Sequence, residues 1–170
     1  LWCPLRNVET PGAETSAGAT SGSPNGRQCC IGLIGRFAPQ KRQREFVAAA
    51  GRLPADWRFV LCGDVRFGDR RSERYREQVL ASAPASVRDL GWRDDVYEVL
   101  GGLDLLVVPS AQEGGVPRVI LEAFAAGVPV LALASGAIPE VVREPENGFL
   151  LGSATPAEIA RRLRELLARP

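Results

Sequence analysis

The stretch that decides the fold runs from residue 109 to residue 142 and reads PSAQEGGVPRVILEAFAAGVPVLALASGAIPEVV. Its pattern is that of a strand end, a glycine loop, a short helix, a tight turn and a second buried strand, followed by another glycine loop and helix start. Two carboxylates, Glu113 in the first loop and Glu122 inside the helix, flank the first helix start. Backbone N–H groups, a helix dipole and two acceptor side chains would thus face one crevice. This arrangement suits a ligand that carries both phosphate and hydroxyl groups.

The same alternation extends over the rest of the chain from residue 30 onward. The apolar run LDLLVV at 103–108 is continuous, as expected for a strand that is buried on both faces. Alternating elements predict an α/β fold, a Rossmann-like parallel sheet with helices on both faces. Ligands of such sheets bind at the carboxyl ends of the strands. We expect strands at 31–34, 59–62, 87–90, 103–108, 130–134 and 149–151, and helices at 42–51, 71–81, 96–101, 119–126 and from 156 onward.

The last helix has the clearest start signal in the chain. Thr155 is placed to cap it, Pro156 stands at its first position, and Glu158 completes a capping box. Ile159, Leu163, Leu166 and Leu167 form one apolar stripe at helical spacing, which predicts a face packed on the core.

Composition excludes several classes of function. The chain has 170 residues, a formal net charge of +1 and no apolar run near the roughly 20 residues that span a membrane, so neither nucleic acid nor a transmembrane segment is expected. It contains no histidine, which excludes Ser-His-Asp and Cys-His catalysis and the common zinc ligands. We expect no metal and no cofactor. Chemistry would depend on carboxylates, arginines, backbone dipoles and Lys41, which is the only lysine.

Residues 1–28 differ in composition from the rest. They are rich in Gly, Ser, Thr, Ala and Pro and lack periodicity, so we expect a flexible linker or tail, followed by one ligand-binding domain over residues 29–170. The linker and the absence of methionine indicate a piece of a longer protein. The four cysteines, Cys3, Cys29, Cys30 and Cys62, have no disulfide-like spacing, which favours small buried residues and a reducing, cytoplasmic compartment.

The segment GRFAPQK, residues 35–41, is the first candidate site. Arg36 would leave the first strand and Lys41 would open the next helix, so a planar guanidinium and a mobile ammonium could together neutralise a diphosphate. A surface arginine and a helix-start lysine without a ligand would produce the same seven residues. The segment is neither a Walker A loop nor a G-x-G-x-x-G fingerprint.

Two further segments would lie at the same edge of the sheet. In the first, Gly114 and Gly115 free the backbone to face an anion, and Glu122 could accept hydrogen bonds from vicinal sugar hydroxyls. The same residues would be found if Glu113 were a solvated loop carboxylate and Glu122 a helix carboxylate stabilised by the dipole, with no ligand. In the second, SGAIPE at 135–140, a glycine turn leads into another helix, and a plain strand-to-helix turn is the commoner explanation.

Residues 30–170 resemble the C-terminal, donor-binding half of a GT-B glycosyltransferase, specifically glycosyltransferase family 4, whose members retain the anomeric configuration. The resemblance rests on the order and spacing of motifs over nearly the whole domain: Gly35-Arg36 with Lys41, LCGD at 61–64, LGW at 90–92, DLLVVPS at 104–110, EGGVPRVILEAFAAGVPV at 113–130, GAIPE at 136–140 and NGFL at 147–150.

The resemblance implies roles for individual residues. Arg36 and Lys41 would hold the donor diphosphate, Glu113 would contact the donor sugar, and Glu122 would bind the ribose hydroxyls. The backbone around Trp92 would border the base, and Gly35 would be a further donor-binding residue. The amides of Gly114, Gly115 and Val116 would line the sugar and phosphate. The family usually places seven residues between its two glutamates, whereas this chain has eight, which leaves the place of Glu113 in question.

The resemblance also implies a nucleotide diphosphate sugar as donor and an N-terminal acceptor-binding domain as partner, with sugar transfer only when the two halves are joined. That missing half could bring the protein to the inner membrane surface. Three alternatives remain open: a non-catalytic nucleotide-sugar-binding or interaction module, a nucleotide-sugar epimerase of the same architecture, and a glycosidase that uses Glu113 and Glu122 as its acid/base pair. The last would leave Arg36 and Lys41 without a role.

Overall fold

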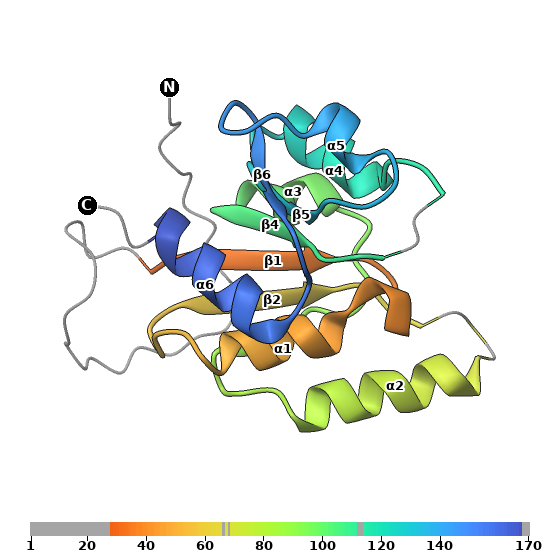
Figure 1. Ribbon diagram of the computed structural model, residues 1–170. Helices are drawn as coiled ribbons and strands as arrows, with labels where there is room; N and C mark the ends of the chain where they lie inside the picture. The colour runs from red at the N-terminus through yellow and green to blue at the C-terminus, as the bar shows by residue number, and fades with distance from the viewer. Residues whose placement is uncertain (1–27, 66, 68, 112–113, 168–170) are drawn as a thin grey trace.

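The computed structural model describes residues 28–65, 67, 69–111 and 114–167 (Figure 1). Within these ranges the chain forms one six-stranded sheet with the order β3-β2-β1-β4-β5-β6, in which every neighbouring pair is parallel. This is the strand order of a classic dinucleotide-binding sheet, with its switch point between β1 and β4. The strands are β1 Cys30–Ile34, β2 Arg58–Cys62, β3 Val87–Asp89, β4 Leu105–Val108, β5 Val130–Leu133 and β6 Gly148–Leu151.

Helices cover both faces of the sheet, as Figure 1 shows. One face carries α1 (Gln43–Ala50), α2 (Arg70–Ala81) and α6 (Pro156–Leu167), and the other carries α3 (Val96–Gly101), α4 (Arg118–Ala125) and α5 (Ile138–Val141). A short 3-10 helix, η1 (Pro39–Lys41), precedes α1. The α/β fold class predicted from the sequence is therefore confirmed.

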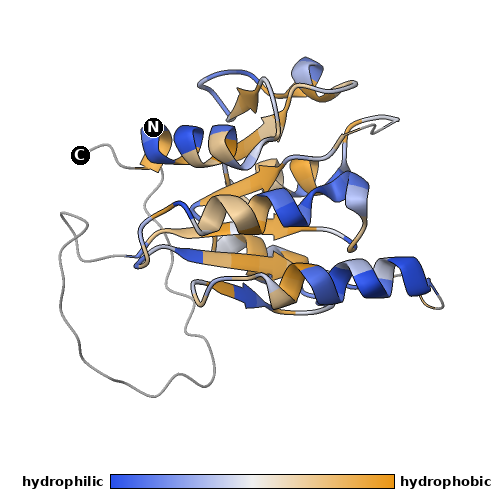
Figure 2. Cartoon of the chain, turned by 60° about the horizontal axis from the view of Figure 1, so that its bottom comes forward, coloured by the Kyte–Doolittle hydropathy of each residue, from blue (hydrophilic) through white to orange (hydrophobic). Residues whose placement is uncertain are grey.

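The two layers of helices enclose two apolar cores that share the strands. In β4, Leu105 and Val107 belong to the core under α1, α2 and α6, whereas Leu106 and Val108 belong to the core under α3 and α4. Because side chains alternate along a strand, a strand that is buried on both faces must be apolar at every position. In Figure 2 the strands are mostly apolar, whereas the helices around them mix polar and apolar residues.

All the strands and helices that we expected lie within a few residues of their predicted bounds. The 3-10 helix is an addition, and Arg42 behind it adopts a left-handed conformation with φ 57° and ψ 39°. The capping box of α6 is only half formed. Thr155 Oγ1 accepts from the backbone N–H of Glu158 at 3.3 Å, but the Glu158 carboxylate accepts instead from the guanidinium of Arg161.

The predicted linker at 1–28 lies, apart from residue 28, outside the described residues. Cys62 is buried, as predicted, and burial raises the pKa of its thiol, although nearby Arg93 acts in the opposite direction. Cys30 is only half-buried.

Candidate functional site

The loop that follows β1 is held in place by its neighbours at the carboxyl edge of the sheet. Gly35 N donates to Cys62 O at 2.8 Å and Phe37 N donates to Asp64 O at 3.0 Å, so the loops after β1 and β2 run side by side. The side-chain amide of Gln43 donates to the carbonyl of Arg36 at 2.8 Å. The Arg36 side chain itself is exposed. The loop therefore fixes the backbone that carries this guanidinium and leaves its head group in solvent.

A second loop contact crosses the switch point between β1 and β4. Ala111 N, in the loop after β4, donates to Gln40 O in η1 at 3.0 Å. This hydrogen bond joins the segment that ends in Lys41 to the segment that leads toward α4. Arg36, Lys41 and the start of α4 consequently lie at one edge of the sheet, where the order of the strands reverses.

Close approach of the first two loops explains why Gly63 has no side chain. Its φ is +139°, and a Cβ at this position would come within 2.3 Å of the Gly35 carbonyl oxygen. Gly35 has a φ of +155° with open space around the position of its missing Cβ. Gly63 is therefore required by the packing of one loop against another, whereas Gly35 leaves room in front of the end of β1.

Gly114, Gly115 and Val116 lead into α4, while Gln112 and Glu113 lie outside the described residues. Nothing stands within 4 Å of a Cβ built on either glycine, and neither has a φ in the left-handed region. The N-cap of α4 is Pro117, and no side-chain hydrogen bond caps the helix among the described residues. Since the first backbone N–H groups of a helix have no partner inside it, this helix start can accept an anion.

Glu122 lies in the second turn of α4, with its side chain only 19% exposed. Its carboxylate accepts from the guanidinium of Arg118, 3.0 Å from Nη2 and 3.3 Å from Nε, and the Arg118 side chain is 90% exposed. Arg118 is not among the site residues predicted from the sequence, although its spacing of four residues from Glu122 is typical of an ion pair on a helix. A hydroxyl ligand of Glu122 would share the carboxylate with this arginine.

Trp92 lies beyond β3 at the same edge of the sheet, because Gly63 N donates to Gly91 O at 2.8 Å. Its side chain is 68% exposed, and its Nε1 donates to Asp94 at 2.9 Å. Arg93 donates to Asp95, and this hydrogen bond is the main reason why the pKa of Asp95 falls below its ordinary value. The loop thus offers an open aromatic face beside a neutralised charge pair.

The segment at 135–140 follows β5, next to β4. Gly136 adopts a left-handed φ of 56°, Ile138 is buried, and Glu140 is exposed without capping α5. The structure brings this turn to the same edge of the sheet, where it has the form of a plain strand-to-helix turn.

Within the described ranges, no group of three or more Asp, Glu or Cys side chains is placed to hold a metal ion. Likewise, the helices in the described part of the chain are too short or too polar to cross a membrane.

The sequence profile of the family described as glycosyl transferases group 1 matches residues 28–169. The chain belongs to this family. Its described domain has the fold of the C-terminal half of a GT-B glycosyltransferase, as the resemblance implied. This result confirms the glycosyltransferase relationship that we expected from the sequence motifs, whereas the assignment to family 4 and retention of configuration stay predictions.

Relatives of this glycosyltransferase family match the chain over most of its length. The lipopolysaccharide core biosynthesis glycosyltransferase LpsE of Rhizobium meliloti is 30% identical over 135 residues, which are 79% of this chain and 38% of that protein. The chain spans less than half the length of the curated relatives that it matches.

Solved structures show the same domain. Anabaena HepE, crystallised in complex with UDP-glucose, is 27% identical with a TM-score of 0.74, over 82% of this chain and 39% of that one. The C-terminal domain of a group 1 glycosyl transferase (LpcC) from Francisella tularensis is 26% identical with a TM-score of 0.68, over 83% of this chain and 76% of that one.

Proposed function

We propose that this domain binds the nucleoside diphosphate sugar donor of a glycosyltransferase, and that the complete enzyme, with an N-terminal acceptor-binding domain, transfers the sugar with retention. The observation that carries the proposal is the meeting of two loops at the switch point, where Ala111 N binds Gln40 O. Through this contact, the segment with Arg36 and Lys41 is joined to the segment that leads to α4, whose N-cap Pro117 has no capping side chain. HepE, a related protein, was crystallised with UDP-glucose.

Each group has a place in the proposed chemistry. The anomeric C–O bond breaks, and its electron pair passes to the departing β-phosphate oxygen of the nucleoside diphosphate. A hydroxyl of the acceptor forms the new bond to the anomeric carbon and gives its proton to the departing diphosphate. Arg36, Lys41 and the first N–H groups of α4 stabilise the negative charge that grows there, and no metal is required for this. Preorganised electrostatics of this type is usually the largest catalytic contribution. Glu122 holds the ribose, and Glu113 contacts the donor sugar.

A non-catalytic nucleotide-sugar-binding module is the second candidate. Two observations favour it: the family spacing between Glu113 and Glu122 is exceeded by one residue, and Arg118 already occupies the Glu122 carboxylate. Sugar transfer by the full-length protein excludes this module, and analysis of the product separates transfer from epimerisation.

Calorimetry with UDP and GDP tests the donor site. Arg36→Ala should weaken binding of the preferred nucleotide about tenfold or more, because a hydrogen bond to a charged group is lost. Arg143→Ala, which removes the same charge from the loop before β6, serves as the control and should leave affinity unchanged. Equal affinity of Arg36→Ala and the wild type would contradict the proposal.

A further inference from the structure

A cavity of about 380 Å³ lies between η1 and α2, on the face of the sheet that carries α1, α2 and α6. Apart from Pro39, the residues around it belong to α2, and they include none of the residues that we assign to the donor. The lining residues are Pro39, Arg70, Arg71, Arg74, Tyr75 and Gln78.

The charge of this cavity is not balanced by the helix that forms it. Half of the lining residues are arginines, and the ion pairs found among the described residues include none of the three. The two acids of α2, Glu73 and Glu77, lie at helical positions opposite Arg71 and Gln78. Each acid is three residues from another cavity arginine, Glu73 from Arg70 and Glu77 from Arg74. The side of α2 that carries Arg71, Tyr75 and Gln78 therefore holds no acid.

Acidic groups near the cavity are engaged elsewhere. The Asp69 carboxylate accepts from the hydroxyl of Ser72 at 2.6 Å and from the backbone N–H groups at the start of α2. These hydrogen bonds, more than its interaction with Arg71, lower the pKa of Asp69. Glu45, on α1, lies 3.8 Å from Arg42. Neither carboxylate therefore neutralises the arginines of the cavity in the way that a bound anion would.

Neutral donors complete the cavity wall. The hydroxyl of buried Tyr75 accepts from Arg44 N at 3.2 Å and so retains its own proton for another acceptor. Burial raises the pKa of this phenol, so the hydroxyl stays protonated. Arg44 lies over the Tyr75 ring at 5.5 Å and donates to Gln78 Oε1 at 2.8 Å, which leaves the amide N–H groups of Gln78 to face outward.

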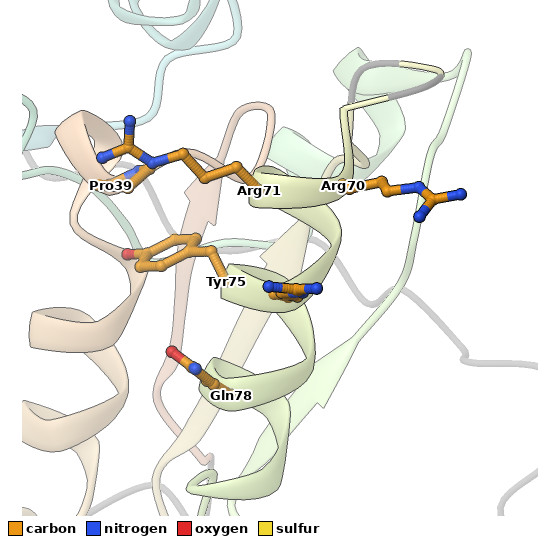
Figure 3. A pocket seen from close by; sticks show the side chains of 6 residues that line it. Pro39, Arg70, Arg71, Tyr75 and Gln78 are labelled. Carbon is orange, nitrogen blue, oxygen red and sulfur yellow. The ribbon is translucent and has the colours of Figure 1, made fainter.

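Figure 3 shows how the side chains are arranged. Arg71 reaches across from α2 toward Pro39, above the Tyr75 ring, and Gln78 approaches the ring from below. Arg70 extends to the other side of the helix, away from the ring. A guanidinium, a phenol hydroxyl and a primary amide thus surround one hollow.

We propose that this cavity binds a phosphate group, through the guanidinium groups of Arg71 and Arg74 and the hydroxyl of Tyr75. Two arginines three residues apart on a helix face the same way, and each guanidinium fits two phosphate oxygens with its planar fork. The site does not depend on the donor assignment. It borders the same 3-10 helix, however, because Pro39 opens η1 and Lys41 ends it.

The probe is inorganic phosphate, followed by amide and side-chain NMR of the 170-residue chain. We expect shifts of the Gln78 side-chain amide and of α2, and about tenfold weaker binding in Arg71→Ala and in Arg74→Ala. Arg71→Lys keeps the charge but loses the planar fork, so its phosphate affinity should lie between those of the wild type and Arg71→Ala. Arg143→Ala is the charge-matched control, because Arg143 lies in the loop before β6, the strand at the other end of the strand order from β2 and β3. Shifts confined to Gly35, Gly114 and Gly115, or affinity unchanged in both alanine variants, would overturn the proposal.

Vesicles distinguish the source of the phosphate. The chain is sedimented with phosphatidylcholine vesicles that contain or lack phosphatidylglycerol, beside the Arg71→Ala/Arg74→Ala double variant. Binding to anionic vesicles that the double variant loses assigns the site to a lipid headgroup. Binding of free phosphate without vesicle binding assigns it to a soluble phosphorylated ligand. Vesicle binding that the double variant keeps, with no phosphate-induced shift in α2, overturns the site.

Discussion

The side-chain amide of Gln43 holds the backbone carbonyl of Arg36 across 2.8 Å, seven residues back along the chain. Gln43 is only 1% exposed, and its Oε1 has no hydrogen-bond partner among the described residues. A residue at the start of α1 thus fixes the loop whose guanidinium we assign to the donor diphosphate. A buried polar group with one unsatisfied atom is tolerated because the other atom orders this loop.

Replacement of Gln43 tests this anchor. Gln43→Leu removes the donor and also the unpartnered oxygen, so its cost in free energy of unfolding should be no more than about 1 kcal/mol. Gln43→Glu is nearly isosteric but cannot donate when ionised, and it buries a charge, so it should destabilise more. Both should weaken nucleotide binding, measured by calorimetry beside denaturant unfolding. Gln40→Ala, which keeps the carbonyl that binds Ala111, is the control, and equal nucleotide affinity in all three variants would exclude the anchor.

Gly63→Ala should destabilise the fold through two independent effects. The left-handed conformation alone costs about 1–3 kcal/mol for a residue with a Cβ. The new Cβ would also meet the Gly35 carbonyl oxygen, which belongs to the backbone and cannot swing away. Gly101→Ala at the end of α3, where a Cβ meets nothing within 4 Å, should be neutral or slightly stabilising. Thermal unfolding compares the two, and similar midpoints would refute the close approach of the loops.

Most of the fold could be predicted because its signals are local. The apolar run of β4, the glycine and proline that end α4, and the cap of α6 each determine structure within a few residues. The 3-10 helix and the left-handed Arg42 could not be predicted, since they depend on contacts with β2 and β4 loops distant in sequence. The same is true of the Gln43 anchor and of the basic cavity beside α2.

Of the predicted site residues, Arg36 and Lys41 follow β1, and Gly114 and Gly115 follow β4, so these loops lie at the carboxyl edge of the sheet. The role of Glu122 on α4 stays a prediction, and its partner Arg118 was not predicted although the spacing of four residues was visible. Whether Glu113 faces the same crevice stays a prediction, because it lies outside the described residues.

Glu122 can be tested through the ligand as well as through the protein. Glu122→Ala should weaken binding of a nucleoside diphosphate about tenfold, because two ribose hydroxyls lose a charged acceptor. The same substitution should hardly change binding of the 2′,3′-dideoxy analogue, which already lacks those groups. Arg118→Ala, which frees the carboxylate, should leave stability within about 0.5 kcal/mol of wild type, as expected for an exposed pair. Equal losses for both nucleotides would show that Glu122 does not bind the ribose.

The start of α2 should be sensitive to acid, because the Asp69 carboxylate caps it. Hydrogen bonds from Ser72 lower its pKa in the folded protein, so the unfolded chain binds the proton more tightly. Its contribution to stability is therefore complete above the ordinary aspartate range and is lost as pH falls through the lower, folded value. Asp69→Ala should reduce stability at neutral pH and flatten the acid side of the stability curve. Asp69→Asn keeps a capping oxygen and should restore much of the neutral-pH stability. An unchanged acid slope in Asp69→Ala would contradict this role.

The central claim is that a donor diphosphate binds where the loops after β1 and β4 meet. Amide NMR shifts of the chain titrated with a nucleoside diphosphate test it most directly. We predict that the largest shifts fall at Gly35, Arg36, Lys41, Gly114 and Gly115, with weaker shifts near Trp92. Saturable shifts confined to α2 or β6, with these five amides unmoved, would contradict the account.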